Sequence, residues 1–252
     1  MEAALGSGLP IEALLVSESG EKHLAKLAHL IDSKCNVLRT TDRLFAGIAD
    51  TQTPQGVAVL LPPPISTAED ILRGVPLVVV LVGVQDPGNV GTIVRAAEAF
   101  GATGAIASST GDLGTADPFG PKAMRASAGS ALRLPILRNA AADIVAQLQA
   151  SNVKICAAVP DVHGKQDGKT SGLPPLAKPW EVDWKSPTAL LIGNEGAGLP
   201  DKIVAGADFR VSIPQAAATT PVGVESLNAA MAATVLLYEA MRQRGAVGRQ
   251  KL

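Results

Sequence analysis

The chain has 252 residues, of which 47% are hydrophobic, 18% charged and 3% aromatic, and its formal net charge at pH 7 is −1. The length suits one large domain, or a small domain beside a larger one, and the abundance of Ala, Val, Leu and Ile suits buried parallel strands and close-packed helices. The near-zero charge excludes a global basic field that attracts nucleic acid, so any binding of RNA or DNA depends on a local basic patch.

Residues 1–61 are expected to form a small α/β domain. Hydrophobic patterns predict, in chain order, a strand at 12–17, a helix at 21–31, the segment 36–40, a helix at 42–49 and a strand at 56–61. Three consecutive prolines then begin a stiff linker, which we place at residues 62–74 because the composition changes there.

Residues 75–245 are expected to form a second, larger domain, followed by a flexible tail at 246–252. Its apolar runs, which we predict as strands, are 77–84, 104–108, 133–137, 153–159, 188–193 and 209–213. Its helical patterns are 91–101, 120–129, 138–151, 200–207 and 225–244. Strands that alternate with helices and are apolar on both faces predict a parallel sheet covered by helices on both sides.

Several function classes lack the residues that they need. Cys35 and Cys156 have no redox or metal-ligand spacing, and no histidine stands at such a spacing from Cys, Asp or Glu, so we expect no metal site. The sequence contains neither a G-x-S-x-G elbow nor a G-x-x-x-x-G-K-[ST] loop, which argues against a triad hydrolase and a P-loop enzyme. Without a signal-peptide pattern, and with an apolar run at 75–84 too short to span a bilayer, the chain is expected to be soluble and cytoplasmic, with no membrane partner.

The first corner, residues 86–95, reads D-P-G-N-V-G-T-I-V-R and follows the first apolar run of the larger domain. A dinucleotide-binding fingerprint needs G-x-G-x-x-G, but the glycines here are spaced G-x-x-G, so we reject that function. Asn89 offers an amide that suits helix capping or base reading, and Arg95 offers a planar fork for phosphate. The structural alternative pairs Arg95 with Glu98 across one helical turn.

Two further corners follow later apolar runs. In the second corner, residues 189–200, the run G-N-E-G-A-G exposes backbone groups that suit an adenine edge or a ribose, while the alternative is an ordinary turn with Glu195 solvated. In the third corner, residues 211–232, a small-residue loop leads to E-S-L-N and a long apolar helix, which Glu225 or Ser226 alternatively caps.

Taken in order, the corners resemble one family. D-P-x-N-x-G-x-x-x-R, L-x-x-G-N-E-G-x-G-L and I-P…E-S-L-N-x-A-x-A, with a K-x-x-R-x-S-x-G segment within residues 122–130, resemble the SpoU (TrmH-like) RNA 2′-O-ribose methyltransferases of the SPOUT superfamily. The resemblance covers about residues 76–244. It implies a SPOUT-type parallel sheet whose C-terminal segment forms a trefoil knot, where general folding rules predict an unknotted sheet.

The N-terminal region carries a weaker resemblance. Residues 44–60 resemble the end of the family's small RNA-binding domain, which is similar to a ribosomal-protein fold. That domain usually begins with a strand containing V-E-G, which does not precede Met1. Either the start of the chain is truncated or this member is shorter, and both explanations stay open.

The resemblance implies that S-adenosylmethionine binds in a bent pose where the second and third corners pack together. The implied contacts, largely through backbone groups, are Leu190, Ile192, Gly193, Gly198, Ile213 and Leu227. It also implies a homodimer with the active site near the subunit interface. The loop at residues 215–224 is longer than is usual in the family, which adds residues where cofactor and RNA are expected to meet.

The resemblance further places Arg95 at the reacting centre, where the family's arginine is sometimes proposed as the general base. Because the pKa of arginine exceeds about 12, we expect Arg95 instead to grip phosphate, orient the ribose and stabilise developing charge. Asn89, Glu195, Ser226 and Asn228 complete the candidate catalytic set and are expected to position RNA or brace the loops.

The leading hypothesis is therefore methylation of a ribose 2′-hydroxyl in RNA, with rRNA favoured over tRNA on the analogy of the two-domain layout. One alternative is a tRNA ribose methyltransferase. Another is a non-catalytic RNA-binding or ribosome-assembly factor that retains the fold. A dinucleotide-dependent oxidoreductase fails on the glycine spacing of the first corner.

Overall fold

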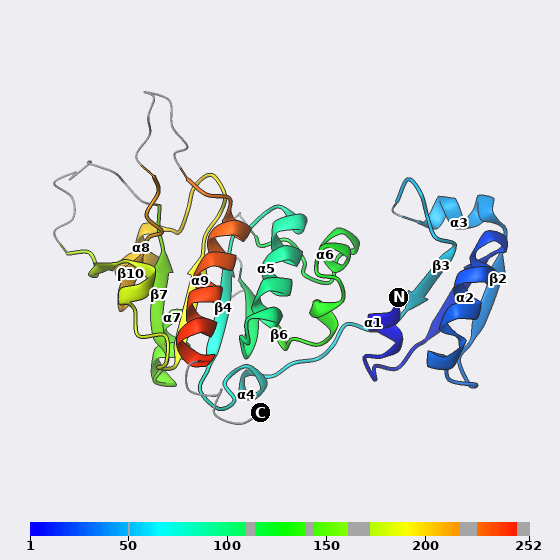
Figure 1. Cartoon of the computed structure of the whole chain (residues 1–252), viewed down its shortest axis with the longest axis horizontal. Helices are drawn as coiled ribbons and strands as arrows, with labels where there is room; N and C mark the ends of the chain where they lie inside the picture. Colours follow the sequence, from blue (N-terminus) through cyan, green and yellow to red (C-terminus); the bar gives the residue numbers. More distant parts are fainter. Residues whose placement is uncertain (50, 109–113, 140–143, 161–171, 217–225, 246–252) are drawn as a thin grey trace.

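The computed structural model describes residues 1–49, 51–108, 114–139, 144–160, 172–216 and 226–245. These residues form a three-stranded sheet of order β2-β1-β3 and a seven-stranded sheet of order β6-β5-β4-β9-β7-β10-β8. Figure 1 shows the two sheets in separate bodies joined by an extended segment. No helix in this part of the chain is long and apolar enough to cross a membrane.

The small sheet contains β1 (Ala13–Ser17), β2 (Val37–Thr40) and β3 (Val57–Leu60), with β1 parallel to β2 and antiparallel to β3. Its helical segments are η1 (Glu18–Gly20), α2 (Glu21–Leu27), η2 (Ala28–Leu30) and α3 (Asp42–Ile48). Leu14 and Val16 of β1 are fully buried, and Leu27 and Phe45 of the helices are buried as well. The order of elements matches the sequence prediction for this region.

The large sheet is parallel at every pairing in the described residues. Its strands are β4 (Leu77–Val82), β5 (Gly104–Ser108), β6 (Ile136–Asn139), β7 (Lys154–Ala158), β8 (Leu176–Ala177), β9 (Thr188–Ile192) and β10 (Phe209–Val211). All six residues of β4 are buried, and alternate residues belong to two different hydrophobic clusters, one on each face. The predicted parallel sheet with two covered faces is thus confirmed.

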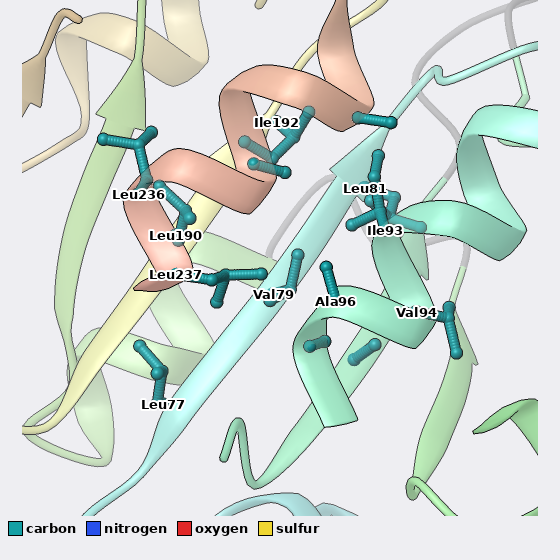
Figure 2. Packing of buried hydrophobic residues seen from close by; sticks show 14 of the residues in the cluster. Leu77, Val79, Leu81, Ile93, Val94, Ala96, Leu190, Ile192, Leu236 and Leu237 are labelled. Carbon is teal, nitrogen blue, oxygen red and sulfur yellow. The ribbon is translucent and has the colours of Figure 1, made fainter. Parts of the chain in front are cut away.

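Helices cover both faces of this sheet. One face carries α5 (Pro87–Ala99), α6 (Pro121–Ala126), η3 (Ser130–Leu132), η4 (Pro179–Glu181) and α9 (Ala229–Gly245), and Figure 1 shows α9, α5 and α6 side by side. The other face carries α4 (Ala68–Ile71), α7 (Ile144–Ala150) and α8 (Asp201–Ala205). Figure 2 shows Leu236 and Leu237 of α9 lying over the strands near Leu190 and Val79, so α9 is held by core packing.

Two long helices begin at other residues than predicted. Helix α5 begins at Pro87, before the predicted start at residue 91, because the Asp86 carboxylate caps it by accepting the Gly88 N–H at 2.8 Å. Helix α9 begins at Ala229, since the prediction from residue 225 included the loop that leads into it. Residue 225 itself lies outside the described residues.

Two short helices lie near the predicted domain boundaries. Residues 68–71 of the predicted linker form α4, which starts with a capping box at Thr67 and packs Ile71 into the large domain at 2% exposure. Helix α1 (Glu2–Leu5), predicted as part of the small domain, contacts η3 of the large one, where a side chain at Gly129 would overlap Ala3. Residues 68–71 are thus helical within the predicted linker, and the boundaries at 61 and 75 stay predictions.

Some predictions fall on residues that the structure does not describe. The knot requires the path of residues 217–225, which lie outside the described residues, as does the tail at 246–252. Most of the longer loop at 215–224 lies there too. The knot, the flexible tail and the effect of the longer loop therefore stay predictions.

The glycine at position 91 is required by the packing of α5 against α6. A Cβ at Gly91 would lie 2.7 Å from Ala126 Cβ and 2.9 Å from Ser127 N, and closer still to the Ala123 carbonyl oxygen. We therefore expect Gly91→Ala to lower the free energy of unfolding by about 1–3 kcal/mol, because the two helices must separate. Urea unfolding measures the change.

A matched control is Gly47→Ala in α3, where a Cβ meets nothing within 4 Å. This change is expected to leave stability equal or slightly higher, as for other exposed helical glycines. Equal stability of Gly91→Ala and the unchanged chain would contradict the close packing of α5 on α6.

Candidate functional site

The three corners meet at one edge of the large sheet. In a parallel sheet all carboxyl ends lie at the same edge, and the first, second and third corners follow β4, β9 and β10. Strand β4 has β5 on one side and β9 on the other, so the chain order reverses there. Open α/β sheets bind ligands at such a switch point.

The second corner is a compact loop that is folded against its own strand. A Cβ at Gly193 would lie 2.5 Å from Leu199 N and 2.6 Å from the Gly198 carbonyl oxygen, so only glycine allows this close return. Asn194 Oδ1 accepts the backbone N–H groups of Gly196 and Ala197, both at 2.9 Å. These contacts give the loop a defined shape.

Glu195 of the second corner binds the first corner. Its carboxylate accepts Asn89 Nδ2 at 2.8 Å and the backbone N–H groups of Gln85 and Asp86 at 3.2 and 3.4 Å. Asn194 Nδ2 adds a bond of 2.8 Å to the Gly83 carbonyl oxygen. The predicted alternative in which Glu195 is merely solvated is wrong.

These hydrogen bonds also determine the charge of Glu195. Burial by itself raises its pKa, but the hydrogen bonds from Asn89 and from the backbone N–H groups of Glu195, Gln85 and Asp86 outweigh burial and lower the pKa below its usual value. Glu195 is therefore an ionised acceptor at neutral pH, and not a proton acceptor tuned to the operating pH.

Asn89 connects the first corner to the third as well. Its Oδ1 accepts Asn228 Nδ2 at 3.1 Å, while Asn228 Oδ1 accepts the N–H groups of Ala230 and Met231 at 2.8 and 3.3 Å. Asn228 thus caps α9, the role that was considered for Ser226. Both ends of the Asn89 amide have protein partners, so neither of its predicted roles, helix cap or base reader, is supported.

Lys122 of α6 contacts the first corner from its other side. Its Nζ lies 2.8 Å from Asp86 Oδ1, and this hydrogen bond, together with the Gly88 N–H, lowers the pKa of Asp86. The K-x-x-R-x-S-x-G segment therefore supports the start of α5. Sequence reasoning identified the segment but assigned it no contact.

Arg95 does not make the contact predicted by the structural alternative. Glu98 instead accepts Arg133 Nε at 2.6 Å and Nη2 at 2.7 Å, and this pairing lowers the pKa of Glu98. Within the part of the chain that the structure describes, exposed Arg95 has no hydrogen bond or ion pair. Its guanidinium is left to bind another molecule.

A cleft opens beside the second corner, between the ends of β7, β9 and β10 and the start of α9. The candidate residues that line it are Ile192, Gly193, Glu195, Gly198, Ile213, Ser226 and Leu227. Sequence reasoning missed the wall formed by residues 158–160 and by Ala229, Ala232 and Leu236, which carry no polar or glycine signal. The structure therefore brings together most of the predicted cofactor contacts.

Leu190 is the exception. It is fully buried in the core cluster beneath α9 and does not line the cleft. Leu190 and Ile192 point to the same face of β9, but only Ile192 is at the strand end. The side chain of Leu190 therefore contributes to packing, and its predicted contact with the cofactor stays a prediction.

Comparison with known proteins agrees with this geometry. The model of the SpoU rRNA Methylase family matches residues 76–238. A 23S rRNA (uridine(2479)-2′-O)-methyltransferase of Streptomyces viridochromogenes is 34% identical over 96% of this chain and 79% of its own length. The 23S rRNA (guanosine(2553)-2′-O)-methyltransferase RlmP of Bacillus subtilis (strain 168) is 29% identical over 94% of this chain and 84% of its own.

A solved structure extends the similarity to the whole fold. The SpoU methyltransferase AviRb from Streptomyces viridochromogenes, in complex with the cofactor AdoMet, is similar with a TM-score of 0.76 and 29% identity. The match covers 97% of this chain and 87% of that one. The chain belongs to the SpoU rRNA methylase family and has the SPOUT α/β fold.

Proposed function

We propose that this protein transfers the methyl group of S-adenosylmethionine to a ribose 2′-hydroxyl of ribosomal RNA. The observation that carries the proposal is the meeting of three distant corners at one sheet edge, where Asn89 is hydrogen-bonded to both Glu195 and Asn228. The second and third corners also line a cleft for a cofactor, and Arg95 of α5 has no protein partner among the described residues.

The cleft fits the cofactor in its chemistry. Ile192, Ile213 and Leu227 give it aliphatic walls that match the faces of an adenine ring. At Gly198, which has φ of +69°, a side chain would meet nothing within 4 Å, so the backbone there is accessible to a ligand. When bound, S-adenosylmethionine supplies an electrophilic methyl carbon on a sulfonium, which requires no metal.

The protein's own residues hold and orient the reactants. Arg95 binds a phosphate of the RNA, places the ribose and stabilises the charge that develops on its oxygen. The lowered pKa values of Glu195 and Asp86 make both carboxylates poor proton acceptors. Ser226, exposed at the cleft, is the side chain that we assign to contact with the bound RNA.

We favour ribosomal RNA over tRNA as the substrate because relatives named for 23S rRNA match nearly the whole chain. The two relatives named for 23S rRNA match 96% and 94% of this chain, so the match includes the small domain. We assign that domain to RNA binding. A cytoplasmic location is consistent with the two free cysteines, Cys35 and Cys156.

The protein is further proposed to act as a homodimer. Helix α9 exposes Met231, Val235 and Tyr238 at 63%, 41% and 51%, and their spacing places them along one side of the helix. An apolar stripe of this kind on an otherwise packed helix is typical of an interface. A second copy of the chain is the occupant that we assign to it.

Arg95→Ala is expected to lower kcat/KM for methyl transfer by about 10- to 100-fold, because a charged hydrogen bond to phosphate contributes about 1.5–3 kcal/mol. Incorporation of labelled methyl groups into a 23S rRNA transcript measures the rate. Arg73→Ala, which removes an exposed arginine at the end of α4 on the opposite face of the sheet, is the matched control. Normal turnover by Arg95→Ala would refute the role of Arg95.

Val235→Glu is expected to convert a dimer into a monomer, because it places a charge in the middle of the apolar stripe. Sedimentation velocity reports the oligomeric state. Ile65→Glu, at a residue 96% exposed outside the stripe, is expected to leave the dimer intact. If the unchanged chain sediments as a monomer, or Val235→Glu stays dimeric, the assignment of α9 is wrong.

A further inference from the structure

We propose that Asn89 is a clasp that couples cofactor binding to RNA binding. Its amide joins the two walls of the cofactor cleft, at Glu195 and Asn228, to the helix that carries Arg95. The inference rests on the proposed function and adds to it a regulation of the same site. In this view Asn89, Glu195 and Asn228 are positioning residues that act through one another and through α5.

The direction of each hydrogen bond is dictated by chemistry. An ionised Glu195 can only accept, so it must face the Asn89 Nδ2 donor at 2.8 Å. Asn228 Oδ1 is already bound by the N–H groups of Ala230 and Met231, so its Nδ2 must face Asn89 Oδ1 at 3.1 Å. One amide orientation satisfies both neighbours, and the reversed orientation satisfies neither.

The clasp spans the cleft. Glu195 belongs to the second corner, which forms one wall, and Asn228 caps α9, which forms another wall. A cofactor that contacts both walls sets the distance between them. Asn89 moves with the walls because it is hydrogen-bonded to a residue of each. Neither wall moves without stretching one of these two hydrogen bonds.

The RNA side is linked through α5. Asn89 stands in the first turn of this helix, and Arg95 lies six residues later, about 9 Å along a rigid helix axis. The backbone bonds of Gln85 and Asp86 to Glu195 hold the start of the same helix. A change in the distance between the two walls therefore changes the position of Arg95. By thermodynamic linkage, RNA bound at Arg95 changes the affinity for the cofactor by the same factor as the cofactor changes the affinity for RNA.

A polarity swap tests the clasp. Asn89→Asp places a carboxylate against Glu195 and repels it, while Asn89→Asp with Glu195→Gln restores a donor and an acceptor in exchanged positions. The amide oxygen introduced at position 195 takes the place of Oε2 and still accepts the Gln85 N–H, while the amide nitrogen takes the place of Oε1, which in the unchanged protein also accepts the Asp86 N–H at 3.4 Å. If Asn89 instead contacted the RNA directly through its amide, the exchange of donor and acceptor with residue 195 would not restore function.

The measurement is the dissociation constant of S-adenosylhomocysteine, the cofactor without its transferable methyl group, by calorimetry, with and without saturating unmodified 23S rRNA transcript. In the unchanged protein we expect RNA to tighten cofactor binding by about 5-fold or more. We call the dissociation constant without RNA divided by that with RNA the coupling ratio. With Asn89→Asp this ratio is expected to fall below about 2-fold, and the double variant is expected to recover most of the unchanged protein's ratio.

Asn228→Asp separates coupling from folding. Its carboxylate still accepts the N–H groups of Ala230 and Met231 and so still caps α9, but it no longer donates to Asn89. We expect the melting temperature to be retained and the coupling ratio to fall. Asn228→Ala, which removes both the cap and the donor, is expected to lower the melting temperature and the coupling ratio.

The outcomes distinguish this inference from the proposed function. An unchanged protein that neither binds S-adenosylmethionine nor methylates the transcript refutes the proposed function. An unchanged protein that does both, but whose cofactor affinity is the same with and without RNA, overturns the clasp alone. Full coupling in Asn89→Asp or Asn228→Asp, or no recovery in the double variant, overturns it too.

Discussion

Parallel pairing of β4 with β9 is the constraint on which the candidate site depends. The register sets Leu77 opposite Thr188 and Leu81 opposite Ile192, so two strands far apart in the chain end at the same edge. Strand β7 pairs with β9 and β10 pairs with β7, which brings a third and a fourth strand end to that edge. Because apolar burial on both faces holds the strands in place, the loops at their ends are available for binding.

The long elements of this sheet could be predicted from the sequence because their apolar patterns extend over many residues. Helices α1 and α4 and strand β8 were missed, since segments of two to four residues are too short to show a period. The early start of α5 did have a signal. Asp86 followed by Pro87 is a cap followed by a favoured first helical residue, and this pair indicates a helix that begins at residue 87.

The side-chain contacts of the site were harder to predict, because they cross between elements. Arg95 and Glu98 have suitable helical spacing, yet Glu98 binds Arg133 from another segment with both of its oxygens. Likewise, a motif predicts both Leu190 and Ile192 as cofactor contacts but does not indicate that Leu190 is buried while Ile192 lines the cleft. Gly91 gives a third example, since its spacing does not indicate the close contact between α5 and α6 that it permits.

The chemistry of methyl transfer explains why a site built in this way is sufficient. When the methyl group is transferred, the S–CH₃ bond of the sulfonium breaks and its sulfur leaves as a neutral thioether, which needs no acid. The proton of the ribose hydroxyl is released to solvent as the new C–O bond forms, so the protein's main contribution is the alignment of two reactants. The carboxylates nearest to the first corner, Glu195 and Asp86, have lowered pKa values because backbone and side-chain donors hold them as fixed acceptors. Their charge serves to orient Asn89 and Lys122 and, through these residues, the helix of Arg95. In the function proposed above, a near-neutral chain binds RNA through the Arg95 guanidinium, with the geometry supplied by hydrogen bonds in the place of a broad basic field.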